Sequence, residues 1–310
     1  MNAGGARGRT EWRDVDGIVL LDKPPGLGSN AALQRVRRLY RARKAGHTGS
    51  LDPLASGVLP LCFGQATKVA GLLLEADKIY HATLALGLRT DTGDREGVIV
   101  ERLPVPVLGP AAVARVLARF VGTSEQVPPM YSALKRAGQP LYALARRGLE
   151  VERVARRITI TRLAALAVGE GSLSFEVACS KGTYVRTLAE DIARAFGTCG
   201  HLAQLRRIAI AGFEGQGLHT LEALERLAGE IEALDALLLP VDAPLAHLPA
   251  IVLGADAATA LCLGRAVATA RGPTGRVRLY DERRRFLGLG EVAAGREVVA
   301  PLRLMCAVAG

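Results

Sequence analysis

One glycine-rich segment, residues 45–57 (AGHTGSLDPLASG), brings together the residue types that could do chemistry. It holds a single carboxylate, Asp52, five residues after His47. Because the residue before a proline is pushed away from helical dihedrals, Asp52 followed by Pro53 predicts a turn or an extended loop. A carboxylate in such a loop can act as a nucleophile or a general base. An aspartate before proline is also a common turn former, so the segment alone leaves both interpretations open.

The sequence contains no motif for a bound cofactor or metal ion. It lacks the G-x-G-x-x-G and Walker patterns, and no group of acids, histidines and cysteines has metal-ligand spacing. Asp91 and Asp94, in the segment RTDTGDREG, could suggest a cation loop, although a polar turn explains them. The five cysteines are an odd number without a C-x-x-C pair: Cys62, Cys179, Cys199, Cys262 and Cys306. They predict buried free thiols, with neither a disulfide nor a zinc site.

The flanking segments predict the elements that position the loop. Residues 17–24 (GIVLLDKP) are typical of a buried strand, and Ser29 is the expected N-cap of a helix that runs to about Arg43. After the loop we expect a strand near 58–64, a helix over 65–75 and a strand near 79–88. Later strands and helices mix without a strict strand–helix–strand alternation. This pattern favours an α+β fold with a mixed or largely antiparallel sheet.

Charge divides the chain into three regions. The net charge of +10 combines +11 in residues 1–220, −5 in residues 221–244 and +4 in residues 245–310. The acidic stretch therefore masks a second basic region. We predict a mobile tail over residues 1–13, a first domain over 14–244, and a small β-rich domain over 245–310.

Composition and hydropathy limit the class of protein. A hydrophobic fraction of 49% is enough to bury a core and excludes a disordered chain. No apolar run approaches the roughly 18–20 residues of a membrane span, and the first residues lack the apolar core of a signal peptide. We therefore expect a cytoplasmic protein with no membrane association.

The predicted helix after Ser29 carries a basic face. Its cations are Arg35, Arg37, Arg38, Arg41, Arg43 and Lys44, and no acid lies among residues 35–44. A solvated helix face would explain these residues, but the unbroken sign favours a surface that faces phosphate.

Several segments resemble, in order, the motifs of one enzyme family. They are GIVLLDKPPGLGSNAALQRVRRLYRARKAGHTG, GHTGSLDPLASGVLPLCFGQATK, DKIYHATLALGLRTDTGDREG, QVPPMYSALKRAGQPLYALARRG, CSKGTYVRTLAEDI and HLAQLRR, which cover about residues 17–210. On these motifs the chain is similar to the tRNA pseudouridine synthase B (TruB) family. Ser50 and Ser56 stand where alanine and threonine are common in that family.

The resemblance implies that one uridine of the tRNA T-loop, at the conventional position 55, is converted to pseudouridine. By their positions in the motifs, Asp52 would be the catalytic carboxylate, Arg186 would pair with it, and Tyr80 would stack on the target base. Further residues would surround that base: Tyr184 and Leu205 along the pocket, His47 on the side that faces RNA, and Lys23 as a support of the pocket.

The resemblance also implies a domain plan. A pseudouridine synthase catalytic domain would be followed by a PUA-type RNA-binding domain at 245–310. The segment 128–153 would be an insertion that wraps the RNA hairpin. The expected partner is the T-arm stem-loop of tRNA, and the insertion favours a stand-alone enzyme, a monomer that needs no guide RNA.

These residue types suit an isomerisation. Pseudouridine forms when the N1–C1′ bond breaks, the uracil turns and C5 joins C1′, so no redox cofactor or metal is required. A carboxylate would act at C1′ or on the uracil ring, and the sequence leaves this choice open. An arginine within about 4–6 Å would keep Asp52 ionised by lowering its pKa. Extrusion of the base costs a few kcal/mol, which stacking and phosphate contacts offset.

Other interpretations compete with this one. Without the motifs, Tyr80 would be a core tyrosine and Arg186 the ordinary i, i+4 partner of Glu190. A tRNA-binding chaperone with the same fold would not need its carboxylate. A hydrolase that pairs Asp52 with Asp22 would release free uracil.

Overall fold

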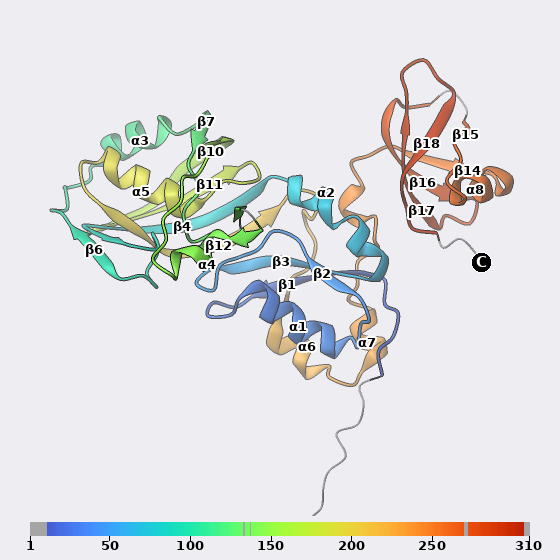
Figure 1. Ribbon diagram of the computed structural model, residues 1–310, viewed down its shortest axis with the longest axis horizontal. Coiled ribbons are helices and arrows are strands. Elements are labelled where there is room, and N and C mark those ends of the chain that lie inside the picture. Colours follow the sequence, from blue (N-terminus) through green and yellow to red (C-terminus); the bar gives the residue numbers. More distant parts are fainter. Residues whose placement is uncertain (1–10, 133, 137, 270–271, 307–310) are drawn as a thin grey trace, which may run out of the picture.

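The computed structural model describes residues 11–132, 134–136, 138–269 and 272–306. A large body built on a nine-stranded sheet stands beside a smaller β-rich body at the C-terminal end (Figure 1). Of the predicted tail, residues 1–10 lie outside the described residues. Arg13 was also assigned to that tail, but it exchanges backbone hydrogen bonds with Arg41 and Arg43 and contacts Asp235, so the tail ends earlier than predicted.

The large sheet is mixed, as the sequence predicts. Its strands are β1 (Gly17–Lys23), β2 (Ala45–His47), β3 (Ser56–Phe63), β4 (Lys78–Leu86), β7 (Gly122–Gln126), β10 (Arg156–Gly169), β11 (Ser172–Cys179), β12 (Gly200–Ile210) and β13 (His219–Thr220). They run in the order β13-β1-β3-β12-β4-β11-β10-β7, with β2 on β3. The parallel contact of β3 with β12 involves only Ser56 opposite Arg206 and Gly57 opposite Arg207. The two halves of the sheet therefore meet over a short stretch.

Alternation along the strands sends side chains to two different faces. Leu21 and Leu59 face a core that is covered by helices, whereas Leu20 and Val58 face a second, smaller core. The helices over the first core are α1 (Ser29–Leu39), α3 (Pro110–Ala118), α5 (Val185–Ala195) and α6 (Leu221–Arg226). The second core is covered by η1 (Gly64–Lys68) and α2 (Ala70–Glu75). The candidate site lies on the first of these faces.

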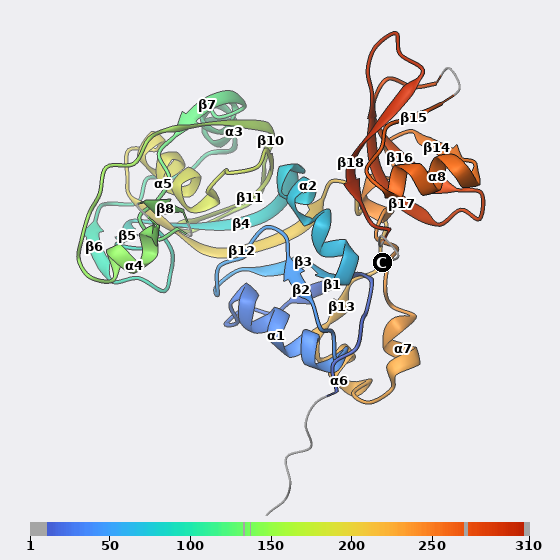
Figure 2. The ribbon, with the colours of Figure 1, turned by 45° about the vertical axis from the view of Figure 1, so that its right-hand side comes forward.

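Shorter elements connect the main ones. They are β5 (Leu88–Thr90), β6 (Ile99–Arg102), β8 (Lys135–Arg136), β9 (Gln139–Pro140), α4 (Leu141–Ala145), α7 (Ile231–Asp235) and η2 (Ala243–Leu245). The predicted insertion 128–153 contains β8, β9 and α4, which form a small lobe beside the sheet (Figure 2).

The first helix differs from its prediction at both ends. Gly28, rather than Ser29, is its N-cap, because the Ser29 hydroxyl exchanges hydrogen bonds with the backbone of Leu51 instead. The helix ends at Leu39 and not near Arg43, because the chain turns into a left-handed conformation at Arg41.

Two other segments also differ from the sequence expectation. The helix predicted over 65–75 is broken at Val69 into η1 and α2, and within η1 the Thr67 hydroxyl donates to the Gly64 carbonyl. The motif HLAQLRR lies in β12, a central strand that the sequence analysis did not identify. The alternation of side chains along β12 is interrupted near Gln204 by a shift in its pairing with β4, and this interruption obscures the strand pattern in the sequence.

The C-terminal body has its own sheet and core. It contains β14 (Ala250–Leu253), α8 (Ala255–Cys262), β15 (Val267–Ala268), β16 (Gly275–Asp281), β17 (Phe286–Val292) and β18 (Val298–Leu304), in the order β14-β16-β17-β18-β15. Val277, Leu279 and Val299 are fully buried in its core. The small β-rich unit that the sequence predicts is present, with one helix added.

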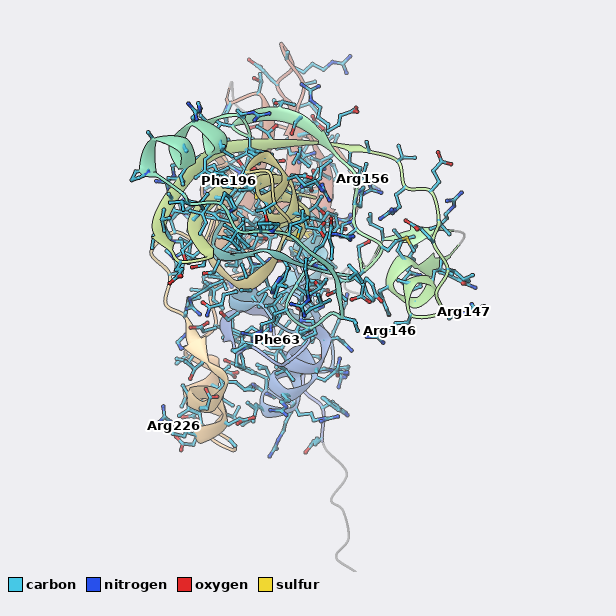
Figure 3. The ribbon with its side chains drawn as sticks, turned by 90° about the vertical axis from the view of Figure 1, so that its left-hand side faces the viewer. Phe63, Arg146, Arg147, Arg156, Phe196 and Arg226 are labelled. Carbon is cyan, nitrogen blue, oxygen red and sulfur yellow. A yellow bond between two sulfur atoms is a disulfide. The ribbon has the colours of Figure 1, made fainter. Side chains whose placement is uncertain are left out.

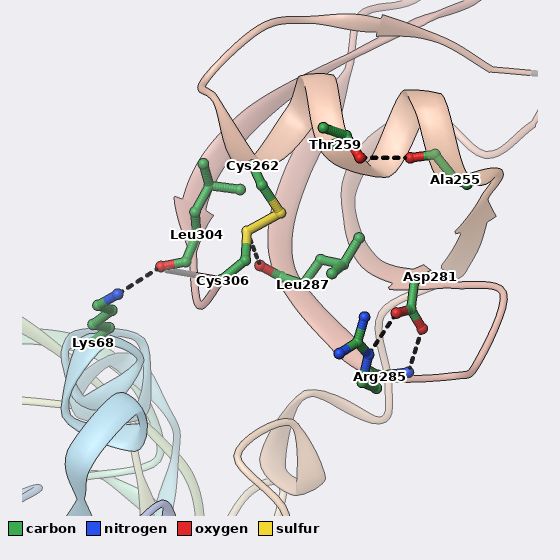
Figure 4. Close-up of a disulfide and its surroundings, with 9 residues drawn as sticks. All are labelled: Lys68, Ala255, Thr259, Cys262, Asp281, Arg285, Leu287, Leu304 and Cys306. Atoms are coloured by element: carbon green, nitrogen blue, oxygen red, sulfur yellow. Dashed lines mark hydrogen bonds and ion pairs between the residues drawn. A yellow bond between two sulfur atoms is a disulfide. The ribbon is translucent and has the colours of Figure 1, made fainter. Parts of the chain in front are cut away.

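The prediction that all cysteines are free thiols is wrong for two of them. Cys262, at the end of α8, forms a disulfide with Cys306, just beyond β18 (Figure 4). The other three cysteines are free and buried. The 44-residue separation gave no sign of the pair, because only the fold brings the end of α8 to the end of β18.

The two bodies touch through the segment next to this disulfide. Lys68 Nζ donates to the carbonyl of Leu304 at 2.9 Å (Figure 4). Val69, Leu289 and Met305 form a small buried cluster between the bodies. Within the described residues, no helix is long and apolar enough to cross a membrane.

Gly57 permits the close approach of β3 and β12 at the middle of the sheet. Its φ is +101°, and an added Cβ would lie 2.1 Å from the carbonyl oxygen of Arg207. A side chain there would therefore be strained by its backbone and would also collide with β12.

We predict that Gly57→Ala lowers the free energy of unfolding by about 2–4 kcal/mol, measured by urea denaturation. Gly71→Ala in α2 is the control, because nothing lies within 4 Å of its added Cβ and alanine favours a helix. Equal stability of the two variants would contradict this role of Gly57.

Candidate active site

The loop between β2 and β3 is fixed by hydrogen bonds from three directions. The carbonyl of Gly49 accepts from Arg207 Nη2 at 2.8 Å. The amide of Leu51 donates to the Ser29 hydroxyl at 2.7 Å, and the hydroxyl donates back to the Leu51 carbonyl at 2.9 Å. The amide of Gly26 donates to the carbonyl of Pro53 at 2.7 Å. Asp52 is thus carried by a loop whose backbone is held on both sides of it.

Asp52 and Arg186 are brought together, as the sequence expectation requires. Arg186 Nε lies 3.0 Å from Asp52 Oδ2. The Arg186 side chain is only 6% exposed, whereas that of Asp52 is 43% exposed, so the carboxylate can still be reached. The rival pair does not form, since Glu190 approaches Arg194 instead.

The remaining donors of Arg186 are also used. Nη1 donates to the carbonyl of Thr92 at 2.9 Å and lies 3.5 Å from Asp94 Oδ2, and Nη2 donates to the carbonyl of Tyr131 at 2.5 Å. Tyr131 belongs to the insertion, so this lobe is tied directly to the arginine. A guanidinium held by so many acceptors has one orientation toward Asp52.

Asp94 is a site residue that the sequence analysis assigned only to a polar turn. It is buried, and its Oδ1 accepts from the Thr92 hydroxyl at 2.8 Å and from the Glu96 amide at 3.0 Å. Its second oxygen faces Arg186. The sequence signal for Asp94 is the motif RTDTGDREG, but nothing in that motif shows which of its acidic side chains turns toward the interior of the protein.

The pKa of Asp52 is raised, not lowered as predicted. Burial of the carboxyl is the largest cause; Arg186 opposes it, and the negative charge of Asp94 adds to it. The predicted effect of the arginine is present but does not outweigh desolvation. The ionised form of Asp52 therefore depends on Arg186.

A row of residues crosses the sheet beneath this loop. Lys23 lies opposite Gly57, Gly57 opposite Arg207, and Arg207 opposite Tyr80, so the three side chains share one face. All three are buried, and Arg207 is only 1% exposed. Arg207 was not singled out from the sequence, although it lies in HLAQLRR, because no pattern distinguishes it from Arg206.

The polar ends of Lys23 and Tyr80 are held by backbone carbonyls or withdrawn from water. Lys23 Nζ donates to the carbonyls of Pro24 at 2.8 Å and Leu27 at 2.6 Å, and burial lowers its pKa to about 8. Burial raises the pKa of Tyr80, with the positive charge of Arg207 opposing the shift. Tyr80 is therefore a neutral phenol with a ring at the floor of the site.

The other predicted residues lie around this centre. Tyr184 is the N-cap of α5; its amide donates to the Gln126 side chain at 2.8 Å, and burial raises the pKa of its phenol. Leu205 lies opposite Ala82 and lines a cavity of about 450 Å³ with Leu54. A larger cavity of about 800 Å³ lies in the C-terminal body and contains none of these residues.

His47 lies on β2, at the edge of β3, opposite Leu61. Burial, and then the charge of Arg207, lower the pKa of its imidazole, so the ring is neutral near pH 7. Its buried Nδ1 has no hydrogen-bond partner among the described residues.

Asp22 does not join Asp52. It occupies the opposite face of β1 from Lys23 and forms two hydrogen bonds with Arg206, at 2.9 and 2.8 Å. No group of three metal-ligating side chains occurs in the described part of the chain. The geometry provides one accessible carboxylate paired with a buried arginine, in a loop next to the row of Lys23, Arg207 and Tyr80.

The insertion beside the site carries exposed cations. Figure 3 shows Arg146 and Arg147 on the lobe that projects from the body of the sheet. Lys135 and Arg136 lie on β8 of the same lobe and are also exposed. With Tyr131 bound to Arg186, this basic lobe begins at the carboxylate–arginine pair.

Three family models match consecutive parts of this chain. They are the N-terminal domain of TruB family pseudouridylate synthases over residues 37–185, the tRNA pseudouridylate synthase B C-terminal domain over 186–246, and the C-terminal domain of pseudouridine synthase II TruB over 249–305. Together with the carboxylate–arginine pair on a mixed sheet, these matches define the class of the chain as a pseudouridylate synthase. The chain belongs to the TruB family.

Curated relatives match over nearly the full length. The tRNA pseudouridine synthase B of Aromatoleum aromaticum is 53% identical over 97% of this chain and 96% of its own length. That of Hydrogenovibrio crunogenus is 49% identical over 96% of each chain.

Solved structures share the fold at lower identity. A Cbf5-Nop10-Gar1 complex contains a chain with a TM-score of 0.71 and 23% identity, over 97% of this chain and 92% of that one. An H/ACA RNP bound to a substrate RNA contains a chain with a TM-score of 0.70 and 22% identity, over 94% and 85%. These likenesses confirm the fold class alone.

We predict that two substitutions shift the pKa of Asp52 in opposite directions. Arg186→Gln removes the nearest positive charge and should raise this pKa further, whereas Asp94→Asn removes a negative charge and should lower it. Carboxyl-carbon NMR titration of aspartate-labelled protein measures both. Shifts of the same sign would contradict the electrostatic roles given to these two residues.

Proposed function

We propose that this protein is a tRNA pseudouridine synthase that isomerises the T-loop uridine at position 55. The contact between Asp52 and the buried Arg186 carries the proposal, because the guanidinium opposes the protonation that burial favours and leaves the carboxylate accessible. The names of the relatives, which share about half of their residues with this chain, support tRNA as the substrate.

In this proposal the carboxylate of Asp52 attacks either C1′ of the ribose or the uracil ring. The N1–C1′ bond breaks, the uracil turns within the pocket, and a bond forms between C5 and C1′. The hydrogen on C5 leaves as a proton and N1 gains one, so atoms and electrons balance without a cofactor. Arg186 keeps Asp52 charged at the start of the reaction and again after the carboxylate is released.

The target base must leave the T-loop stack to reach this carboxylate. Tyr80 supplies a flat, neutral ring for the extruded base, and Tyr184 and Leu205 line its pocket. His47 faces the RNA and helps to hold the target nucleotide out of its stack. Lys23 supports the pocket through the backbone carbonyls that it binds, rather than taking part in the chemistry.

RNA is held by surfaces outside the pocket. The exposed cations of the insertion 128–153 contact the T-arm hairpin, and residues 245–310 act as a PUA-type RNA-binding domain that follows a catalytic domain over 14–244. The lobe next to Arg186 supports a stand-alone enzyme that needs no guide RNA. In this proposal the enzyme is a monomer of the cytoplasm.

A tRNA-folding role is the second candidate. The basic lobe projects away from the sheet, so it could bind and remodel RNA without the carboxylate (Figure 3). Refolding of a tRNA transcript by a variant without Asp52 separates this role from catalysis.

We expect Asp52→Asn to abolish turnover on a naked T-arm hairpin with no guide RNA. The measurement is release of tritium from uridine labelled at C5, which should fall by about 10⁴-fold or more because an amide cannot replace the carboxylate. Hairpin affinity should change by less than about threefold, since phosphate contacts dominate binding.

Asp91→Asn is the matched control. Asp91 lies on the same turn as Asp94 but is exposed, and among the described residues its side chain accepts from the Val98 amide, which asparagine can also satisfy. This variant should keep wild-type turnover. Retained turnover by Asp52→Asn would refute the mechanism, and a wild type that needs a guide RNA would refute the stand-alone function.

A further inference from the structure

Two arginines adopt a backbone conformation that disfavours side chains. Among the described residues, the non-glycine positions with positive φ are Arg41, at +48°, and Arg284, at +61°. In this region the Cβ atom crowds the following carbonyl, so glycine or asparagine is usual. Strained backbone of this kind concentrates at functional sites.

Arg41 occupies the position after α1 that usually holds glycine. The Arg41 amide donates to the carbonyl of Arg38, and the Ala42 amide donates to that of Arg37 at 3.0 Å. This pair of hydrogen bonds is the Schellman motif, which requires a left-handed residue where Arg41 stands. Glycine would close the helix with less strain.

Arg284 occupies a left-handed position in the hairpin between β16 and β17, as Arg41 does after α1. The Arg284 amide donates to the carbonyl of Asp281 at 2.9 Å, and the Asp281 amide donates to that of Arg285 at 3.1 Å. This is a three-residue hairpin loop whose last residue is left-handed, again a usual place for glycine.

Neither side chain stabilises the fold through its own contacts. Both arginines are exposed, and neither guanidinium has a hydrogen-bond or ion-pair partner in the part of the chain that the structure describes. Arg38 and Lys44 are exposed near Arg41, and the exposed Arg283 lies next to Arg284, whereas Arg285 on its other side is paired with Asp281. Among the described residues, no partner of either guanidinium therefore offsets the backbone strain at these two positions.

We infer that Arg41 and Arg284 are RNA-contacting residues whose guanidinium groups bind backbone phosphates. This inference rests on the proposed function and extends it to contacts outside the pocket. A planar guanidinium binds phosphate oxygens in pairs, and a residue fixed by a closed turn presents it with little freedom.

The position of Arg41 in the fold separates its phosphate contact from the target nucleotide. The Ser29 end of α1 touches the loop of Asp52, and the 11-residue helix carries the chain roughly 16 Å away from it. Arg41 is therefore too distant to contact the extruded nucleotide and binds a phosphate elsewhere in the tRNA. Trp12 lies at the same end of α1, with its ring 4.5 Å from the Arg37 guanidinium, and although Asp14 pairs with Arg43 there, Arg38, Arg41 and Lys44 are exposed cations.

Arg41→Gly and Arg284→Gly test the inference, because glycine suits both backbones. The thermal midpoint should stay the same or rise. Affinity for full-length tRNA should fall about 3–10-fold for each variant, and the slope of log affinity against log salt should become shallower by about 0.7–0.9. Turnover at saturating tRNA should not change.

Arg226→Gln, which removes the same charge from the acidic helix α6, is the control and should bind as wild type does. Wild-type affinity and salt slope in the glycine variants would overturn the inference, as would an equal loss in Arg226→Gln. If a glycine variant is less stable than the wild type, the matching asparagine variant, Arg41→Asn or Arg284→Asn, is measured in its place. An asparagine variant that recovers stability and binds tRNA as the wild type does would also overturn the inference. Failure of the wild type to bind tRNA would instead refute the proposed function.

Discussion

The structure depends on keeping one carboxylate charged in a loop that partly withdraws it from water. Burial favours the protonated form of Asp52, and the buried Arg186 is the main group that opposes it. Arg186 can do so because Thr92, Asp94 and Tyr131 hold its other donors. These acceptors come from separate segments, so the turn after β5, the insertion and the start of α5 must all be in place. The pair therefore links the integrity of the fold to the state of the reactive group.

The sheet supplies the second requirement, a rigid backbone for the loop. The two halves of the sheet meet closely only where Gly57 lacks a side chain, and this contact places Arg207 directly under the loop. Arg207 and Lys23 are buried cations that bind backbone carbonyls rather than carboxylates, including that of Gly49. The charge of Lys23 adds to the stabilisation of ionised Asp52 that Arg186 provides, whereas Arg207 fixes the loop through the carbonyl of Gly49. Asp52 thus remains reachable while its backbone is fixed.

Short sequence patterns predicted the strands next to the loop and the residues of the carboxylate–arginine pair. Apolar runs identified β1, β3 and β4, and the motifs led to Asp52 and Arg186, which the structure places in contact. Features set by tertiary contacts were missed. Ser29 binds the loop instead of capping its helix, and Asp94 turns inward for reasons that no spacing reveals. The disulfide was missed for the same reason, because distant segments meet only after folding.

Chemistry and RNA binding are assigned to different parts of the molecule, so the carboxylate can be tested alone. The most direct measurement is the pH dependence of kcat/KM for a T-arm hairpin, which reports the ionisations of the free enzyme. If ionised Asp52 does the chemistry, the acid limb of this profile falls at the pKa of Asp52 that NMR titration gives for the same protein, above the ordinary range for aspartate. A kcat/KM that keeps its plateau through the pH at which Asp52 becomes protonated would contradict that mechanism.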